Sequence, residues 1–322
     1  MKAAVMEAAG GGPVYGEFRE PAAGDGLELI AVTASALSNF SKSRSAGRHY
    51  SSEAVFPVVA GAEGVGRTAD GRRVFFALPE TPFGALAERC VVRSKLCVPV
   101  PEGLSDVEAA ALANPGMSAW AALVERARLV KGETVLVNGA TGSAGKVAVQ
   151  LAKYLGAAKV IATGRNAAAL KELKLVGSDA VVAFDLAQEH GAKLYERALM
   201  AEFADGVDVV LDYLWGETAK TAIVAIARSV EDAQPVRFVH VGGASGEESI
   251  ELPGAALRSS AIQLMGSGIK SVSMQGMLAA VAGTFAAAVE TGMRVETVTR
   301  PLEEIAEAWE LPGRPRVVVT IG

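Results

Sequence analysis

The pattern of apolar positions along the chain changes near residue 105. Before that point, short apolar runs are broken by glycine and proline, which is typical of β-structure. A helical period is present only weakly, around residues 35–47. We therefore predict a β-rich N-terminal region, with strands at Lys2–Met6, Leu27–Ala34, Val65–Thr68, Arg73–Ala77, Leu86–Val92 and Cys97–Pro99.

Strands and helices alternate after residue 105, which predicts a parallel sheet covered by helices on both faces. Ser105 and Glu108 have the spacing of a capping box, so a helix should begin there. The apolar pattern over residues 105–130 predicts two helices. A break between them is expected at Asn114-Pro115-Gly116, because proline lacks a backbone N–H. The remaining strands are expected at Thr134–Val137, Lys159–Thr163, Ala180–Phe184, Val207–Leu211, Val236–Val241, Ala261–Gly266 and Arg316–Ile321, and the helices at 143–155, 167–175, 189–203, 217–228, Met274–Thr291 and Pro301–Trp309.

Residues 134–166 combine a strand, a glycine turn, a helix and a second strand. Glycines at this spacing allow a tight turn, close approach to a pyrophosphate, and close packing of the helix on the sheet. The helix begins near Ser143, so its free N–H groups would face the phosphates. The pattern predicts a dinucleotide site, and the alternative is a glycine-rich turn without a ligand. The expected contact residues are Gly139, Thr141, Gly142, Ser143, Ala144, Gly145, Gly164, Arg165 and Asn166.

The end of the second strand distinguishes NAD from NADP. An NAD site usually has an acidic residue there, which binds the ribose hydroxyls. This chain has Arg165 at that place and no acid before Glu172. A guanidinium can bind a 2′-phosphate through charge-assisted hydrogen bonds, so we favour NADPH over the alternative of a solvated arginine in a turn.

Composition excludes several classes of protein. Half of the 322 residues are apolar and 21% are charged, which argues against disorder. The net charge of −5 provides no basic field for nucleic acid or an anionic membrane. Two cysteines and three scattered histidines suggest neither a disulfide framework nor a metal site. The first residues lack the apolar core of a signal peptide, and residues 277–290 are too short to span a bilayer, so we predict a cytoplasmic protein.

Several motifs in the right order resemble the medium-chain dehydrogenase/reductase superfamily, and within it the zinc-free quinone oxidoreductase branch. The resemblance implies an α/β fold with a GroES-like β-barrel catalytic domain from residues 1–112 and 272–322. A Rossmann domain, a doubly wound parallel sheet that binds NADP(H), would comprise residues 113–271. It also implies a homodimer, with residues 261–270 as a candidate interface. The motifs are LSNF (37–40), PVVAGAEGVG (57–66), FGALAERCVV (83–92), NPGMSAWAAL (114–123), NGATGSAG (138–145), VDVVLD (207–212) and HVGGASG (240–246).

The chain departs from the zinc-dependent relatives where they bind the catalytic metal. Asn39 stands where those relatives have a cysteine, and Ala62 stands where they have a histidine. Their third ligand falls near Asn114. Neither alanine nor asparagine supplies the thiolate or imidazole that holds Zn²⁺, so we expect no metal.

Without a metal, oxidation of a simple alcohol is disfavoured, because the hydroxyl proton has a very high pKa. Hydride transfer from NADPH to a quinone or conjugated enone remains feasible, since the π-system of the acceptor spreads the arriving charge. We predict a metal-free, NADPH-dependent oxidoreductase with a small-molecule acceptor. Two alternatives remain open: a reductase of enoyl thioesters, and a non-catalytic NADPH-binding protein with a sensory or crystallin-like role.

The resemblance also assigns roles to individual residues. Tyr50 matches an active-site tyrosine of this branch and would bind the acceptor oxygen, whereas Asn39 would position the nicotinamide ribose or the acceptor. Tyr50 is otherwise a tyrosine at the rim of the barrel, and Asn39 a turn residue. Asp212, at a strand end, would shape the loop near the cofactor. The nicotinamide end of the site would be lined by Ser118, His240, Gly242 and Gly243.

Overall fold

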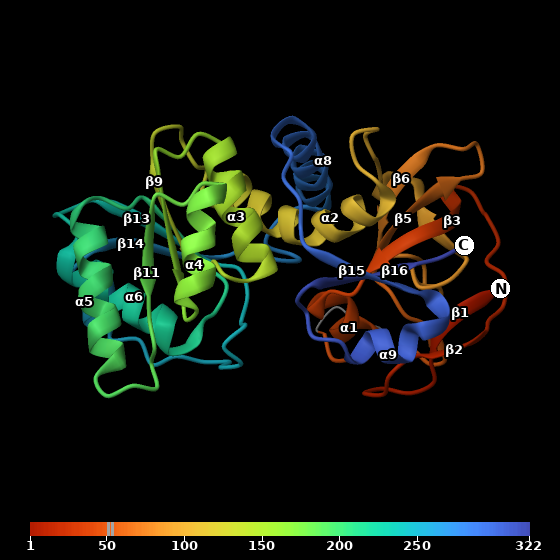
Figure 1. Cartoon of the computed structure of the whole chain (residues 1–322), viewed down its shortest axis with the longest axis horizontal. Coiled ribbons are helices and arrows are strands. Elements are labelled where there is room, and N and C mark those ends of the chain that lie inside the picture. The colour runs from red at the N-terminus through yellow and green to blue at the C-terminus, as the bar shows by residue number, and fades with distance from the viewer. Residues whose placement is uncertain (50–51, 53–54) are drawn as a thin grey trace. The chain divides into compact units, whose positions relative to one another are not determined.

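The computed structural model describes residues 1–49, 52 and 55–322, which form two compact units (Figure 1). Unit 1 comprises Met1–Asn114 and Val281–Gly322, and unit 2 comprises Pro115–Ala280. The expected domain boundaries, after residues 112 and 271, lie N-terminal to both divisions. The second division falls inside one helix, α8 (Met274–Thr291).

Unit 1 is built on two sheets, and both ends of the chain contribute to it. The larger sheet has seven strands, six of them in the order β15-β16-β3-β5-β6-β8, and β7 pairs with β3. A smaller sheet has the order β2-β1-β4. The strands are β1 (Lys2–Met6), β2 (Val14–Glu17), β3 (Leu27–Ala36), β4 (Val58–Val59), β5 (Glu63–Thr68), β6 (Arg73–Ala77), β7 (Arg89–Arg93), β8 (Cys97–Pro99), β15 (Thr297–Pro301) and β16 (Arg316–Thr320).

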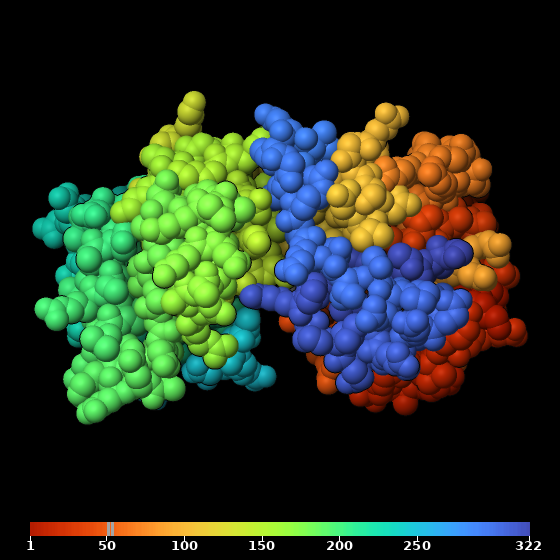
Figure 2. Space-filling view, in the orientation of Figure 1, coloured from red at the N-terminus to blue at the C-terminus, as the bar shows by residue number. Residues whose placement is uncertain are grey.

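The C-terminal segment completes the sheet that the N-terminal segment begins. β16 pairs antiparallel with β3, with Val318 opposite Ala36. In the space-filling view the C-terminal residues (blue) lie on the first strands (red), and α9 packs against β2 (Figure 2). The helices of this unit are α1 (Asn39–Ser45), η1 (Ser94–Leu96), the larger part of α2 (Asp106–Trp120), the second half of α8, η4 (Leu302–Glu304) and α9 (Ile305–Glu310).

Helix α2 begins as predicted but does not break at the proline. The capping box is confirmed: the Ser105 N–H donates to Glu108 Oε2 over 2.8 Å, and the Glu108 N–H donates to Ser105 Oγ over 3.2 Å. The helix continues through Pro115 to Trp120, and a π-helical turn (η2, Ala121–Arg126) follows. The predicted break was wrong, because proline removes one helical hydrogen bond while buried alanines on both sides hold the helix in place.

Unit 2 is a doubly wound α/β fold. Its six strands are all parallel, in the order β11-β10-β9-β12-β13-β14, so the strand order reverses between β9 and β12. The strands are β9 (Thr134–Asn138), β10 (Lys159–Gly164), β11 (Ala180–Ala183), β12 (Val209–Asp212), β13 (Pro235–His240) and β14 (Ala261–Gly266). The helices are α3 (Ser143–Tyr154), α4 (Ala167–Leu173), η3 (Lys174–Val176), α5 (Gly191–Ala204), α6 (Gly216–Ser229) and α7 (Gly254–Arg258).

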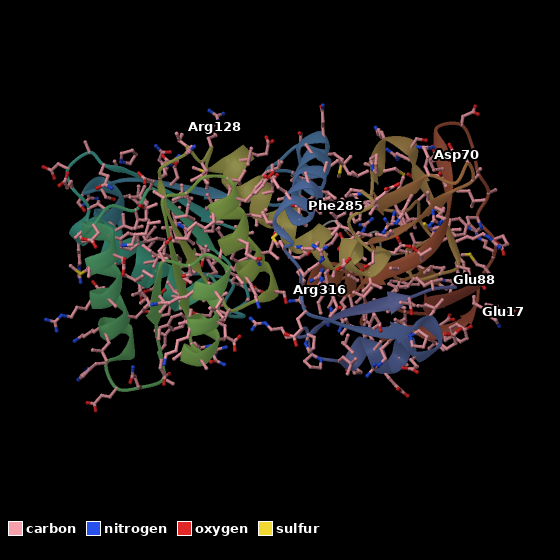
Figure 3. All side chains as sticks on the ribbon, turned by 45° about the horizontal axis from the view of Figure 1, so that its top comes forward. Glu17, Asp70, Glu88, Arg128, Phe285 and Arg316 are labelled. Carbon is pink, nitrogen blue, oxygen red and sulfur yellow. The ribbon has the colours of Figure 1, made fainter. Side chains whose placement is uncertain are left out.

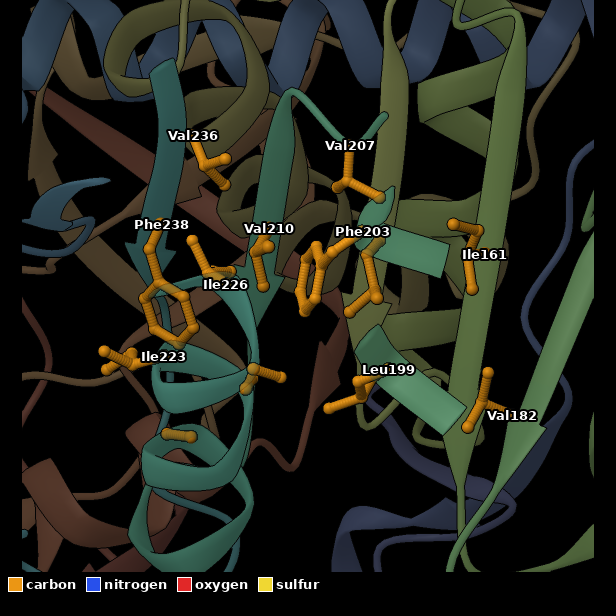
Figure 4. Packing of buried hydrophobic residues seen from close by; sticks show 14 of the residues in the cluster. Ile161, Val182, Leu199, Phe203, Val207, Val210, Ile223, Ile226, Val236 and Phe238 are labelled. Carbon is orange, nitrogen blue, oxygen red and sulfur yellow. The ribbon is translucent and has the colours of Figure 1, made fainter. Parts of the chain in front are cut away.

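Apolar side chains from strands and helices fill one face of this sheet (Figure 4). Phe203 of α5 and Phe238 of β13 are both almost fully buried in this core. Such burial fixes the strand register, because a slip by one residue would expose each buried side chain. The core therefore sets the positions of the strand ends, where the candidate ligand groups lie.

Most differences between the predicted and observed elements involve short segments. The sequence pattern did not predict β2, β4, β15 or α7, and the strand expected at Leu86–Val92 is shorter (β7). Leu86 lies outside a regular strand: its carbonyl oxygen accepts from the Ala4 N–H, and its N–H donates to the Ala60 carbonyl oxygen. No helix in the described part of the chain is long and apolar enough to cross a membrane.

Candidate functional site

The glycine turn of unit 2 leaves the first N–H groups of helix α3 without a hydrogen bond from a capping side chain. Strand β9 ends at Asn138, and Gly139 has a φ of +87°, a conformation that favours glycine. Gly142 is the N-cap of α3 and has no side chain to accept from the first N–H groups of the helix. The N–H groups of Ser143 and Ala144 therefore remain available, and with the helix dipole they attract an anion.

Two glycines of this region lie so close to their neighbours that a side chain would not fit. A Cβ at Gly145 would lie 2.4 Å from the Gly139 carbonyl oxygen, and one at Gly164 would lie 2.8 Å from Thr141 Cγ2. The start of α3 therefore packs directly on the turn, and Thr141 fills the space beside the end of β10. This close packing is what the glycine pattern predicts for a dinucleotide fold.

Arg165 follows the last residue of β10 and is exposed. Among the described residues it forms no ion pair and no hydrogen bond through its side chain. Asn166 is the N-cap of α4, and its Oδ1 accepts from the Ala169 N–H over 3.0 Å. The strand end therefore presents an unpaired guanidinium, as an anion site requires.

A buried network joins three strands at their carboxyl ends. Asn138 of β9 donates from Nδ2 to Oδ1 of Asp212, the last residue of β12, over 2.8 Å. The hydroxyl groups of Thr163 (β10) and Tyr195 (α5) both donate to Asn138 Oδ1, over 2.8 and 3.0 Å. Thr218 Oγ1 also accepts from Asn138 Nδ2, over 3.2 Å. All these side chains are buried, so the strand ends are fixed beneath the ligand edge.

His240 extends this network to the surface. Its Nδ1 lies 3.1 Å from Asp212 Oδ2, and its ring centroid lies 4.4 Å from that of Trp215, with 43° between the ring planes. The side chain is 36% exposed, whereas the Asp212 side chain is fully buried. The backbone N–H groups of Leu214 and Trp215 donate to the same carboxylate. The imidazole is therefore held at the open edge of the sheet.

The loop after β13 is bound to the loop after β12. The N–H of Gly242 donates to the Asp212 carbonyl oxygen over 3.2 Å, and a Cβ at Gly243 would meet nothing within 4 Å. Ser118 is half-buried on α2, and its hydroxyl donates to the Pro115 carbonyl oxygen over 2.9 Å. Gly242, Gly243 and Ser118 are the residues expected at the nicotinamide end, and all three lie in unit 2.

Unit 1 contains two polar side chains of interest, those of Asn39 and Glu63. Asn39 is the first residue of α1, is exposed, and forms no side-chain hydrogen bond with a described residue. Glu63 is buried at the start of β5, next to Ala62. Burial raises the pKa of Glu63 to about 7, while Arg316 and a hydrogen bond from Asn114 act in the opposite direction.

Arg316, which is labelled in Figure 3, is also buried, and burial lowers its pKa. Its Nε and Nη2 atoms and Glu63 Oε1 have no hydrogen-bond partner among the described residues. Glu63 and Arg316 therefore interact electrostatically, but they do not form an ion pair. This pair was not predicted, since no local spacing relates a strand near residue 63 to β16. Tyr195 and Asn138 were likewise not predicted as members of the buried network.

Tyr50, the other predicted catalytic residue, lies outside the described residues. A pocket of unit 1 is lined by residues from α1, β4 and the segments that follow β4 and β6. It includes Ala62 and Arg44. In the part of the chain that the structure describes, no three His, Cys, Asp or Glu side chains gather in a group that could hold a metal ion.

Comparisons with known proteins agree with this geometry. The model of the family described as "Zinc-binding dehydrogenase" matches residues 144–290. A probable NADPH-dependent quinone reductase of Emericella nidulans is 30% identical over 219 residues, which are 65% of this chain and 59% of that protein. One subunit of the phenolphthiocerol/phthiocerol polyketide synthase of Mycobacterium tuberculosis is 30% identical over 244 residues, which are 74% of this chain and 10% of that polypeptide. The chain thus spans little more than half of the first relative and a tenth of the second.

Among solved structures, the quinone oxidoreductase of Thermus thermophilus aligns with a TM-score of 0.79 at 25% identity. The alignment covers 99% of this chain and all of that one. Structures of that protein include a complex with NADPH. The match extends through both units, whereas the family model covers chiefly unit 2.

Proposed function

The chain belongs to the medium-chain dehydrogenase/reductase superfamily, in its quinone oxidoreductase branch, and from this premise we propose that it is an NADPH-dependent oxidoreductase. Unit 1 has the GroES-like fold of these relatives, and unit 2 has the Rossmann fold. We propose that it delivers a hydride to a quinone or a conjugated enone without a metal ion.

One observation carries the cofactor part of this proposal: an uncapped helix start and an unpaired arginine lie at the ends of adjacent strands. The N–H groups at the start of α3 bind the pyrophosphate, and Arg165 binds the 2′-phosphate. The NADPH-dependent quinone reductase and the NADPH complex among the similar proteins support the same cofactor.

The other half of the sheet positions the nicotinamide. In doubly wound folds the dinucleotide lies across the point where the strand order reverses, so its second half lies over β12 and β13. His240, Gly242 and Gly243 follow these strands, and Ser118 lies on α2. When bound, NADPH supplies the hydride, and these residues orient the ring and limit access of water.

The residues of unit 1 restrict the type of acceptor. Asn39, Ala62 and Asn114 provide no thiolate or imidazole at the positions where zinc-dependent relatives bind the metal. The acceptor must therefore be electrophilic already, since no Lewis acid polarises it. Asn39 and Tyr50 donate hydrogen bonds to the acceptor oxygen, which stabilise the charge that develops there.

A second candidate function is reduction of an enoyl thioester, because 74% of this chain is similar to part of a polyketide synthase subunit. An enoyl thioester is also a conjugated carbonyl compound, so the same hydride chemistry applies. The third possibility is a protein that binds NADPH without turnover.

We further propose a homodimer that forms through β14. This strand pairs with β13 on one side only, and its Leu264 side chain is 42% exposed. An exposed edge strand with an apolar residue favours pairing with a second copy. Light scattering coupled to gel filtration tests this proposal, and a monomeric mass would contradict it.

Consumption of NADPH in the presence of quinones, enones and enoyl thioesters separates the three functions. Turnover with quinones or enones supports the first proposal, and turnover with thioesters alone supports the second. Tight NADPH binding without turnover of any acceptor would contradict both enzymatic functions. A failure to bind NADPH would contradict the cofactor proposal itself.

A further inference from the structure

We propose that the His240 side chain recognises the carboxamide of the nicotinamide, with Nε2 accepting a hydrogen bond from the carboxamide N–H. This inference rests on the proposed NADPH function and adds a specific contact to it. From the sequence, His240 was expected at the nicotinamide end only as part of the strand end whose backbone lines the site. The structure points to the imidazole itself.

Asp212 determines which nitrogen of the ring carries the proton. Its carboxylate accepts hydrogen bonds from the backbone N–H groups of Leu214 and Trp215 and from Asn138 Nδ2. An ionised carboxylate can only accept, so the His240 Nδ1 that lies 3.1 Å away must donate. In the neutral imidazole, Nε2 is then an acceptor with a free lone pair.

The ring is also fixed in place. Trp215, which packs against the imidazole, has a φ of +62° and is held by the bond from its N–H to Asp212. The Asp212 carboxylate is fully buried and bound to Asn138, whose Oδ1 accepts from Tyr195. Asp212 is therefore a positioning residue, which restricts both the tautomer and the direction of His240.

The Nε2 atom of His240 is not engaged by another group of the described protein. Among the described residues Nε2 has no hydrogen-bond partner, and the side chain is 36% exposed. His240 is the last residue of β13, and it precedes the loop in which a Cβ at Gly243 would meet nothing. This position lies over the half of the sheet that receives the nicotinamide in a doubly wound fold.

The carboxamide is the part of the nicotinamide that matches this acceptor. Its NH₂ group is the only N–H donor on the ring, and its carbonyl remains available to backbone donors of the loop. A neutral acceptor fixed by a buried carboxylate selects the amide over groups that only accept, since these would leave Nε2 unpaired.

The test compares the binding of two cofactors. The second is the NADPH analogue whose carboxamide is replaced by an acetyl group, which has nearly the same shape but no N–H. Dissociation constants from calorimetry, without acceptor, give the preference for the amide. We expect wild-type protein to prefer NADPH by about tenfold, the value of one hydrogen bond.

Two variants separate the atoms of the ring. His240→Asn keeps a donor at the position of Nδ1 and loses Nε2, so the preference should fall to within about twofold. His240→Gln places an acceptor near the position of Nε2 and should retain most of the preference. Arg165→Ala is the matched control: it should weaken both cofactors equally and leave their ratio unchanged.

The outcomes distinguish this inference from the proposed function. Equal affinity of wild-type protein for the two cofactors, or an unchanged ratio in His240→Asn, would overturn the role of His240 while leaving NADPH binding intact. If wild-type protein binds neither cofactor, the proposed function fails first. Thermal unfolding shows whether each variant is folded. If His240→Asn is not folded, His240→Gln provides the test, and a loss of its preference for NADPH would contradict the role of Nε2.

Discussion

Asn138 donates from Nδ2 to Oδ1 of Asp212 over 2.8 Å, so side chains as well as backbone bonds join the ends of β9 and β12. Asn138→Leu would leave the hydroxyl groups of Thr163 and Tyr195 and the buried carboxylate without this partner. We expect the free energy of unfolding to fall by about 2–4 kcal/mol, because two buried hydroxyl groups lose their acceptor and the Asp212 carboxylate loses one of its donors. Urea unfolding measures the change.

Tyr195→Phe is the control for this experiment. It removes one hydroxyl and leaves the remaining contacts of Asn138, so the loss should be about 1 kcal/mol. Equal losses for the two variants would contradict a network centred on Asn138.

Arg165 separates the two dinucleotides. Arg165→Ala should raise the dissociation constant for NADPH by about 5- to 150-fold, equivalent to 1–3 kcal/mol, and leave that for NADH nearly unchanged. The reason is that only NADPH carries the 2′-phosphate. Binding titrations with both cofactors measure the difference.

Lys193→Ala, a change of an exposed lysine on α5, controls for the loss of one positive charge. It should alter neither constant. An equal effect of Arg165→Ala on NADPH and NADH would exclude the phosphate contact.

Among the glycines of the turn after β9, Gly145 is the one at which a side chain should be least tolerated. In Gly145→Ala the new Cβ would lie 2.4 Å from the Gly139 carbonyl oxygen, so α3 must move away from the turn. We expect NADPH binding to weaken at least about tenfold and the protein to lose about 1–3 kcal/mol of stability.

Gly254→Ala provides the comparison within the same unit. Its Cβ would meet only Arg258 Nη1, at 3.7 Å, which is an ordinary contact. If the two variants bind NADPH equally well, the turn does not contact the cofactor.

Glu63 should make stability depend on pH. Burial raises its pKa from 4.5 to about 7, so the folded state holds the proton more tightly than the unfolded state. The stability that this proton contributes is fully present below about pH 4.5 and is lost as the pH rises to about 7. Relative to Glu63→Gln, wild-type protein should lose roughly 3 kcal/mol over this interval.

Urea midpoints at several pH values measure this loss. Glu307→Gln changes an exposed carboxylate of α9 and should follow the wild-type curve. Parallel curves for wild-type protein and Glu63→Gln would show that Glu63 does not titrate in this range.

The metal-free mechanism predicts that activity survives prolonged treatment with a chelator. Purified protein should contain far less than one zinc ion per chain, because Asn39, Ala62 and Asn114 offer no zinc ligands. Metal analysis by mass spectrometry, combined with an assay before and after chelation, tests this. A loss of activity that zinc restores would contradict the proposal.

The sequence predicted unit 2 better than unit 1, for a physical reason. In unit 2, buried parallel strands form continuous apolar runs and the helices are amphipathic, so the local pattern carries the fold. In unit 1, β2, β4 and β15 are short and partly exposed, and their pairing depends on distant segments. Pro115 was misread because local propensity was outweighed by the packing of α2.

The candidate site divides in the same way. The roles of Gly139, Gly145 and Arg165 can be predicted from a local motif, because its spacing has a known physical reason. The Glu63–Arg316 pair and the link from Tyr195 to His240 depend on contacts between elements far apart in the chain. Of the residues in that link, Asp212 and His240 gave local signals, because both lie at strand ends. Sequence spacing cannot assign such partners.

The pairing of β3 with β16 also determines an order of events on the ribosome. Residues 34–36 of β3 bind the last strand of the chain, which is made only after the whole of unit 2. The fold of unit 2 can therefore be complete while the larger sheet of unit 1 still lacks β15 and β16. During that interval, the open edge of β3 is available for pairing with another chain.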